Sequence, residues 1–139
     1  MGEISEESMR IIFIIPDMLG LSDYMNQFSL KISIPFTVFK EDGWNVSIFD
    51  SNTQDIEKIP ASNMYAFWVI PDTYDSCIRL ATSIKSQHST STIIIGGVYE
   101  ATHSIFDVAF KGATKGVFQQ FIKDWKNGSE ADLYSDEKI

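Results

Sequence analysis

The chain has 139 residues, of which 44% are hydrophobic. This length is typical of one domain, and so large an apolar fraction excludes general disorder. The formal net charge is −8 at pH 7, so nucleic acid is not an expected partner. The single cysteine, Cys77, excludes an internal disulfide, a cysteine-rich zinc site and an iron–sulfur cluster held by this chain.

The sequence predicts neither a membrane span nor an export signal. The N-terminal residues are polar and acidic, and the longest apolar run, residues 64–70, is far shorter than the ~20 residues that cross a bilayer. We therefore expect a cytoplasmic protein with no membrane partner. Residues 1–9 are expected to be a flexible leader, residues 10–127 the domain, and residues 128–139 a polar tail or linker stub.

The first half of the chain predicts two strands separated by a loop and a helix. Residues 11–15 form an apolar, β-branched run that is typical of a buried strand, and Pro16 ends it. Residues 18–34 contain helix breakers and are expected to be irregular. A helix is predicted from Pro35 to Asp42, because proline suits a first helical turn and Gly43 a helix end. Residues 45–50 then alternate like a strand.

The second half predicts three more strands with helices between them. Strands are expected at residues 64–70, 92–95 and 108–110, a helical turn at 55–58, and amphipathic helices at 74–87 and after Thr114. A short helix is expected before the fifth strand. Aromatic residues such as Trp68 and Phe118 are expected in the core. The order predicts an α/β fold, a single doubly wound (flavodoxin-like or Rossmann-like) domain with a five-stranded, mainly parallel sheet.

Four of the predicted strands end in turn residues that leave room for a ligand. These ends are Pro16–Asp17, Pro71–Asp72–Thr73, Gly96–Gly97 and Lys111–Gly112. Ligands of open α/β sheets bind at the carboxyl ends of the strands, and glycine lets a flat ligand approach the backbone. Turn chemistry explains any one of these ends by itself. Together they predict a ligand-binding edge, with a shallow bay beside Gly96–Gly97.

Residues 11–16, 35–50, 93–102 (IIIGGVYEAT) and 107–125 (DVAFKGATKGVFQQFIKDW) together carry a family resemblance. Over residues 10–127 the chain resembles the cobalamin-binding domain at the N-terminus of many radical SAM enzymes. The resemblance implies cobalamin over the strand ends, with the double glycine against its nucleotide tail. The cofactor-binding residues that it implies are Pro16, Asp17, Met18, Pro71, Asp72, Thr73, Gly96, Gly97, Val98 and Gly112.

The chain also departs from that family. The Asp-x-His-x-x-Gly motif, the three-cysteine motif and the catalytic barrel are missing. We therefore expect a domain that is not catalytic by itself. It would hold a corrinoid without a histidine ligand, or act as an accessory to a radical SAM enzyme.

Two other functions stay open. The family's two glutamates after the last strand are replaced by Ala113 and Lys115, and the glycine between them by Thr114. Together with the unusual loop expected at residues 18–34, this favours a degenerate, ligand-free protein-interaction module. Asp17, Asp72 and Lys111 at the strand ends favour a receiver-like signalling domain with Asp72 as the phosphate acceptor.

Overall fold

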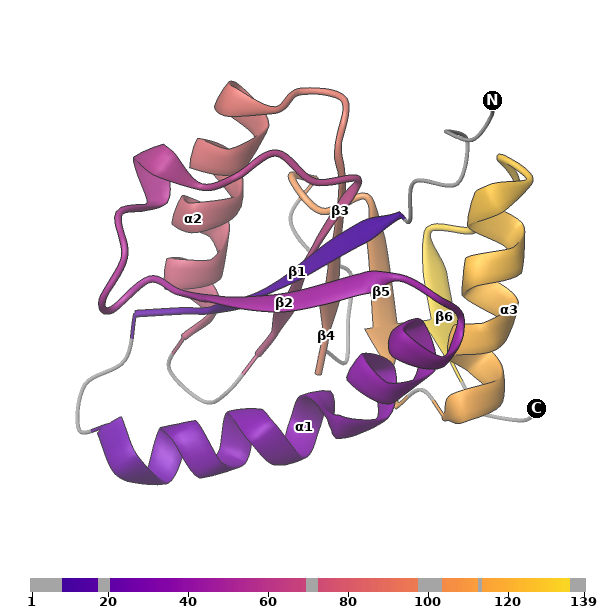
Figure 1. The fold of residues 1–139 in the computed structure, drawn as a ribbon, viewed down its shortest axis with the longest axis horizontal. Coiled ribbons are helices and arrows are strands. Elements are labelled where there is room, and N and C mark those ends of the chain that lie inside the picture. The colour runs from indigo at the N-terminus through magenta and orange to yellow at the C-terminus, as the bar shows by residue number, and fades with distance from the viewer. Residues whose placement is uncertain (1–8, 18–20, 70–72, 98–103, 113, 136–139) are drawn as a thin grey trace.

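Strands and helices follow one another along most of the chain, and the strands form one parallel sheet (Figure 1). The computed structural model describes residues 9–17, 21–69, 73–97, 104–112 and 114–135. The strands are β1 (Arg10–Ile15), β2 (Asn45–Asp50), β3 (Met64–Trp68), β4 (Thr92–Gly96), β5 (Val108–Lys111) and β6 (Leu133–Ser135). The helices are α1 (Leu21–Glu41), α2 (Tyr74–Gln87) and α3 (Lys115–Lys126), with a short 3-10 helix, η2 (Ile56–Lys58).

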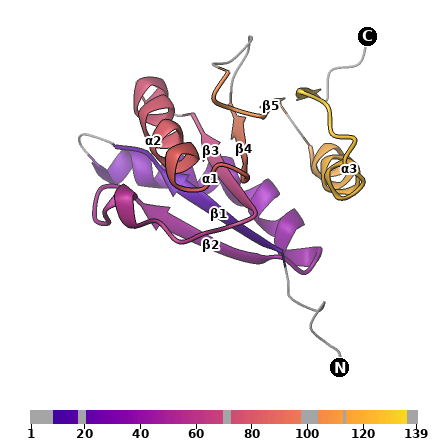
Figure 2. The same ribbon diagram turned by 90° about the horizontal axis from the view of Figure 1, so that it is seen from above.

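The sheet has the order β2-β1-β3-β4-β5-β6, and all neighbouring strands are parallel. Helices α2 and α3 lie on opposite sides of it (Figure 2). Strand β1 shows why both faces are covered: Ile11, Phe13 and Ile15 point towards α1 and α3, whereas Ile12 and Ile14 point towards α2. A strand that is apolar on both faces can only be stable between two helical layers.

The structure confirms the predicted class, a doubly wound α/β domain with a parallel sheet. Strand β2 and helix α2 have the bounds that the sequence predicts, and the other predicted strands differ by a residue or two at their ends. The first five strands have the flavodoxin-like order. The short helix expected before β5 and most of the leader lie outside the described residues. None of the helices described here is long and apolar enough to cross a bilayer.

Helix α1 is longer than predicted, and the expectation of an irregular segment up to Ile34 is wrong from Leu21 onwards. The helix continues through Pro35. A proline in a helix interior removes one backbone hydrogen bond and costs about 3 kcal/mol. However, Phe28, Ile32 and Phe39 are buried on the sheet side of the helix. Each such side chain contributes about 1.5–3 kcal/mol on burial, so tertiary packing outweighs the local preference.

The sheet has six strands where the sequence predicts five, and the additional strand lies in the segment expected as a polar tail. Tyr134 in β6 stacks on Phe110 with ring centroids 5.6 Å apart and meets Phe121 edge-on at 5.4 Å. Its hydroxyl donates a 2.6 Å hydrogen bond to Oδ2 of Asp124. These contacts of one aromatic side chain, together with pairing to β5, hold the short edge strand against the domain.

Candidate functional site

The carboxyl ends of the parallel strands lie at one edge of the sheet, where the sequence predicts a ligand. Among the residues expected to bind a cofactor, the structure describes Pro16, Asp17, Thr73, Gly96, Gly97 and Gly112. Met18, Pro71, Asp72 and Val98 lie outside the described residues. The receiver-like alternative depends on Asp72, so it stays a prediction.

Asp17, which follows β1, is held by side chains of its own chain. The Ser51 hydroxyl donates a 2.9 Å hydrogen bond to Asp17 Oδ1, and Arg79 forms an ion pair with Oδ2. The backbone N–H of Asp17 donates to Ser76 Oγ at 2.9 Å. Asp17 therefore joins the ends of β1 and β2 to helix α2. Sequence reasoning missed these partners because they come from distant segments that no local spacing connects.

Thr73 is buried at the start of α2 and contacts Cys77 one turn later. Its carbonyl accepts a 2.9 Å hydrogen bond from the Cys77 backbone N–H. Burial raises the pKa of the Cys77 thiol to about 12, although a hydrogen bond with the Thr73 side chain acts in the opposite direction. A thiol with such a pKa stays protonated near neutral pH and is a poor nucleophile. The hydrogen bond from Cys77 to the Thr73 carbonyl closes the first turn of α2.

Gly96 lies in a row of residues that face one another across three strands. Trp68 of β3 is paired with Gly96 of β4, and Gly96 is paired with Phe110 of β5. The Trp68 indole lies directly over Gly96. A Cβ added to Gly96 would come within 2.7 Å of indole Cδ2, and closer still to Cε2 and Cζ2. The bay expected over Gly96 is therefore not open, because an indole from the neighbouring strand fills it.

Among the described residues of this edge, Gly97 and Gly112 present accessible backbone. Both are exposed, with φ values of 78° and 61°, a backbone conformation that favours glycine. They follow β4 and β5, which are neighbours in the sheet. A Cβ on Gly97 would lie 3.1 Å from the carbonyl oxygen of Val69, so the backbone after β3 is also close. At these two positions the residue itself carries no side chain that would keep a ligand away from the backbone.

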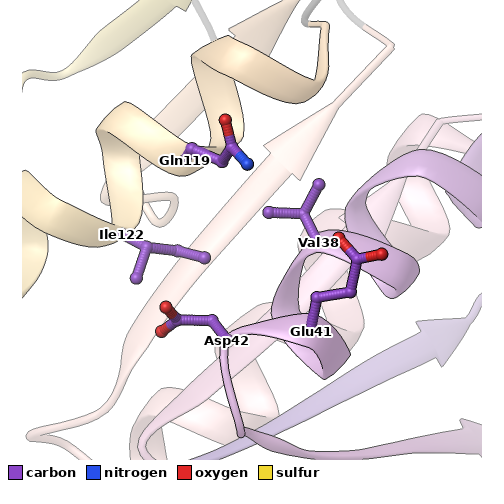
Figure 3. A pocket seen from close by; sticks show the side chains of 5 residues that line it. All are labelled: Val38, Glu41, Asp42, Gln119 and Ile122. Atoms are coloured by element: carbon purple, nitrogen blue, oxygen red, sulfur yellow. The ribbon is translucent and has the colours of Figure 1, made fainter.

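A depression of about 140 Å³ lies elsewhere, between α1 and α3 (Figure 3). It is lined by Val38, Glu41, Asp42, Gln119 and Ile122. Asp42 accepts hydrogen bonds from Lys126 Nζ at 2.6 Å and from Trp44 Nε1 at 3.0 Å. Small-molecule pockets usually measure about 300–1,000 Å³. This small, internally paired groove follows the end of α1, away from the carboxyl ends of the strands, and we do not assign a ligand to it.

The strand ends fit the corrinoid implied by the resemblance only in part. The accessible backbone at Gly97 and Gly112 suits a flat ring lying over β4 and β5. The space beside Gly96, to which the resemblance assigns the nucleotide tail, contains the indole of Trp68, which is only 7% exposed. Beside Gly96, the described residues therefore leave no space for a buried tail. Trp68 lies inside the predicted strand 64–70 and Gly96 directly after the predicted strand 92–95, so their contact could not be predicted from the sequence.

In the described part of the chain, no group of three histidine, cysteine or acidic side chains is placed to hold a metal ion. Comparison of the chain with known protein families, curated proteins and solved structures finds no match. The class of protein is therefore defined by the structure itself, as an α/β domain with a parallel, doubly wound sheet.

Proposed function

We propose that this chain is a cobalamin-binding-like domain, not catalytic by itself, that holds a corrinoid without a histidine ligand. In this proposal it works in the cytoplasm as an accessory to a radical SAM enzyme. The observation that carries the proposal is the pair of exposed glycines with positive φ, Gly97 and Gly112, at the ends of two neighbouring parallel strands.

A flat macrocycle gains most of its binding energy from close contact over a wide area. Side chains at Gly97 or Gly112 would hold it away from the backbone, and their absence allows that contact. The proposal does not use His88 as a cobalt ligand. His88 follows the last turn of α2 and therefore lies at the end of the domain opposite the carboxyl ends of the strands. There its Nε2 lies 3.1 Å from the carbonyl oxygen of Ile59.

The direct test is whether the chain retains hydroxocobalamin. We expect the unaltered chain to elute from gel filtration with corrin absorbance. Gly97→Trp should elute without it, because the new indole would cover the exposed backbone at the carboxyl ends of β4 and β5. Gly128→Trp is the matched control: Gly128 also has positive φ, 71°, but it follows α3 at the other end of the domain. Colourless elution of the unaltered chain, or full retention by Gly97→Trp, would contradict the proposal.

A ligand-free protein-interaction module is the second candidate. It is favoured by the side chains that already occupy parts of the edge: the Trp68 indole over Gly96, and Ser51 and Arg79 on the Asp17 carboxylate. A ligand that binds the folded state raises the unfolding temperature. For this candidate we expect saturating hydroxocobalamin to leave the melting temperature of the unaltered chain unchanged, and a rise would count against it.

A further inference from the structure

The indole of Trp68 is enclosed by the sheet and helix α3. It is stacked on Phe110, with ring centroids 6.1 Å apart and an interplanar angle of 25°. Phe118 of α3 lies 5.7 Å away and Phe13 of β1 lies 6.3 Å away, again between ring centroids. Gly96 forms the surface beneath the ring. This is an aromatic slot, with a glycine on one side and aromatic rings on three others.

A slot of this kind would suit any flat aromatic ring, including a nucleotide base. Trp68 has an advantage over a base from solution, because its ring is tethered to β3. A base that enters from solution must give up translational and rotational freedom, whereas the indole lost most of that freedom when the chain folded. An external base would also have to displace a side chain that is 93% removed from solvent, since Trp68 is 7% exposed.

We propose that Trp68 takes the place of a nucleotide base in this domain, so that the domain recognises a corrinoid by its ring and not by its nucleotide tail. This inference rests on the proposed function and makes Trp68 the residue that determines specificity among corrinoids. Corrinoids with and without the tail then bind the unaltered chain equally well.

The test compares hydroxocobalamin with dicyanocobinamide, a corrinoid that lacks the nucleotide tail, by equilibrium dialysis. For the unaltered chain we expect the two dissociation constants to agree within about threefold. Trp68→Leu opens the slot, and we expect it to bind hydroxocobalamin at least about tenfold more tightly while its affinity for dicyanocobinamide is unchanged. Phe67→Leu is the control, because it shortens a fully buried aromatic residue on the opposite face of β3, and it should behave like the unaltered chain.

The outcomes separate this inference from the proposed function. If the unaltered chain binds neither corrinoid, the proposed function fails, and recognition of the corrinoid ring fails with it. If Trp68→Leu gains no preference for hydroxocobalamin, the inference is overturned whatever the unaltered chain binds. An unaltered chain that prefers hydroxocobalamin by about tenfold or more overturns it as well.

Folding of the variant is checked by circular dichroism before dialysis. If Trp68→Leu does not fold, Trp68→Phe replaces it, because a phenyl ring keeps the aromatic contacts and frees part of the slot. The expected preference is then smaller but has the same direction, and its absence overturns the inference.

Discussion

Gly96→Ala tests directly whether the Trp68 indole rests on the backbone of β4. The added methyl carbon would lie 2.7 Å from indole Cδ2 and nearer to two further ring atoms, whereas carbon atoms in contact prefer about 3.5–4.0 Å. To relieve the nearest contact, the indole would have to move by roughly 1.5 Å, but Phe13, Phe110 and Phe118 enclose it. Overpacking costs about 1–3 kcal/mol, and we expect a loss near the upper end of that range.

The measurement is the free energy of unfolding in urea, followed by far-ultraviolet circular dichroism. The same Gly96→Ala change is repeated in a Trp68→Leu background, where the methyl group has room. There we expect the change to be neutral or to stabilise by about 0.5 kcal/mol, because alanine loses less backbone entropy than glycine. The coupling between the two positions should thus reach about 2–3 kcal/mol.

Gly116→Ala is the control for the substitution itself. Gly116 lies in α3, and no described atom comes within 4 Å of a Cβ placed there. Alanine at this helical position should stabilise the domain by about 0.5–1 kcal/mol. Equal effects of Gly96→Ala in the two backgrounds, or a change of less than about 0.5 kcal/mol in the unaltered chain, would refute the packing described for Trp68.

Three further predictions concern groups with defined electrostatic or hydrogen-bond partners. Burial raises the pKa of the Cys77 thiol from 9.0 to about 12, so the stability contributed by the protonated thiol is lost as pH rises through that interval. Cys77→Ala should therefore reduce the fall in the free energy of unfolding at alkaline pH, measured in urea. An unchanged fall would contradict this. The hydrogen bond from the Tyr134 hydroxyl lowers the pKa of the Asp124 carboxyl, so the contribution of the carboxylate to stability is lost as pH falls through that lowered pKa. Tyr134→Phe should therefore make the melting temperature less sensitive to acid than in the unaltered chain. The same sensitivity in both would argue against the hydrogen bond. Asp17→Asn removes a half-exposed ion pair with Arg79, so we expect the free energy of unfolding to fall by at most about 1 kcal/mol, and by less in high salt. A larger fall that does not depend on salt would contradict the assignment of this contribution to the ion pair.

The local sequence pattern was sufficient to predict helices and strands in which buried residues recur at regular spacing. In α2, Cys77, Leu80, Ala81 and Ile84 are all buried, and their spacing already marks one face of a helix. The apolar runs of β1, β3 and β4 likewise follow from burial on both faces of a parallel sheet. The accessible glycines Gly97 and Gly112 were found because glycine after a strand is itself a signal of a special backbone conformation.

Only the tertiary structure decided the features that depend on strand register and on contacts between distant segments. Helix α1 continues through Pro35 because its apolar face packs on the sheet. Strand β6 is held in the sheet because Tyr134 packs against Phe110 and Phe121. The pairing of Trp68 with Gly96 follows from the alignment of β3 and β4, which neither strand encodes by itself. The residues of one strand do not determine its register with the next. The register decides which side chains face one another, and therefore whether the space at the carboxyl ends of the strands is open or filled.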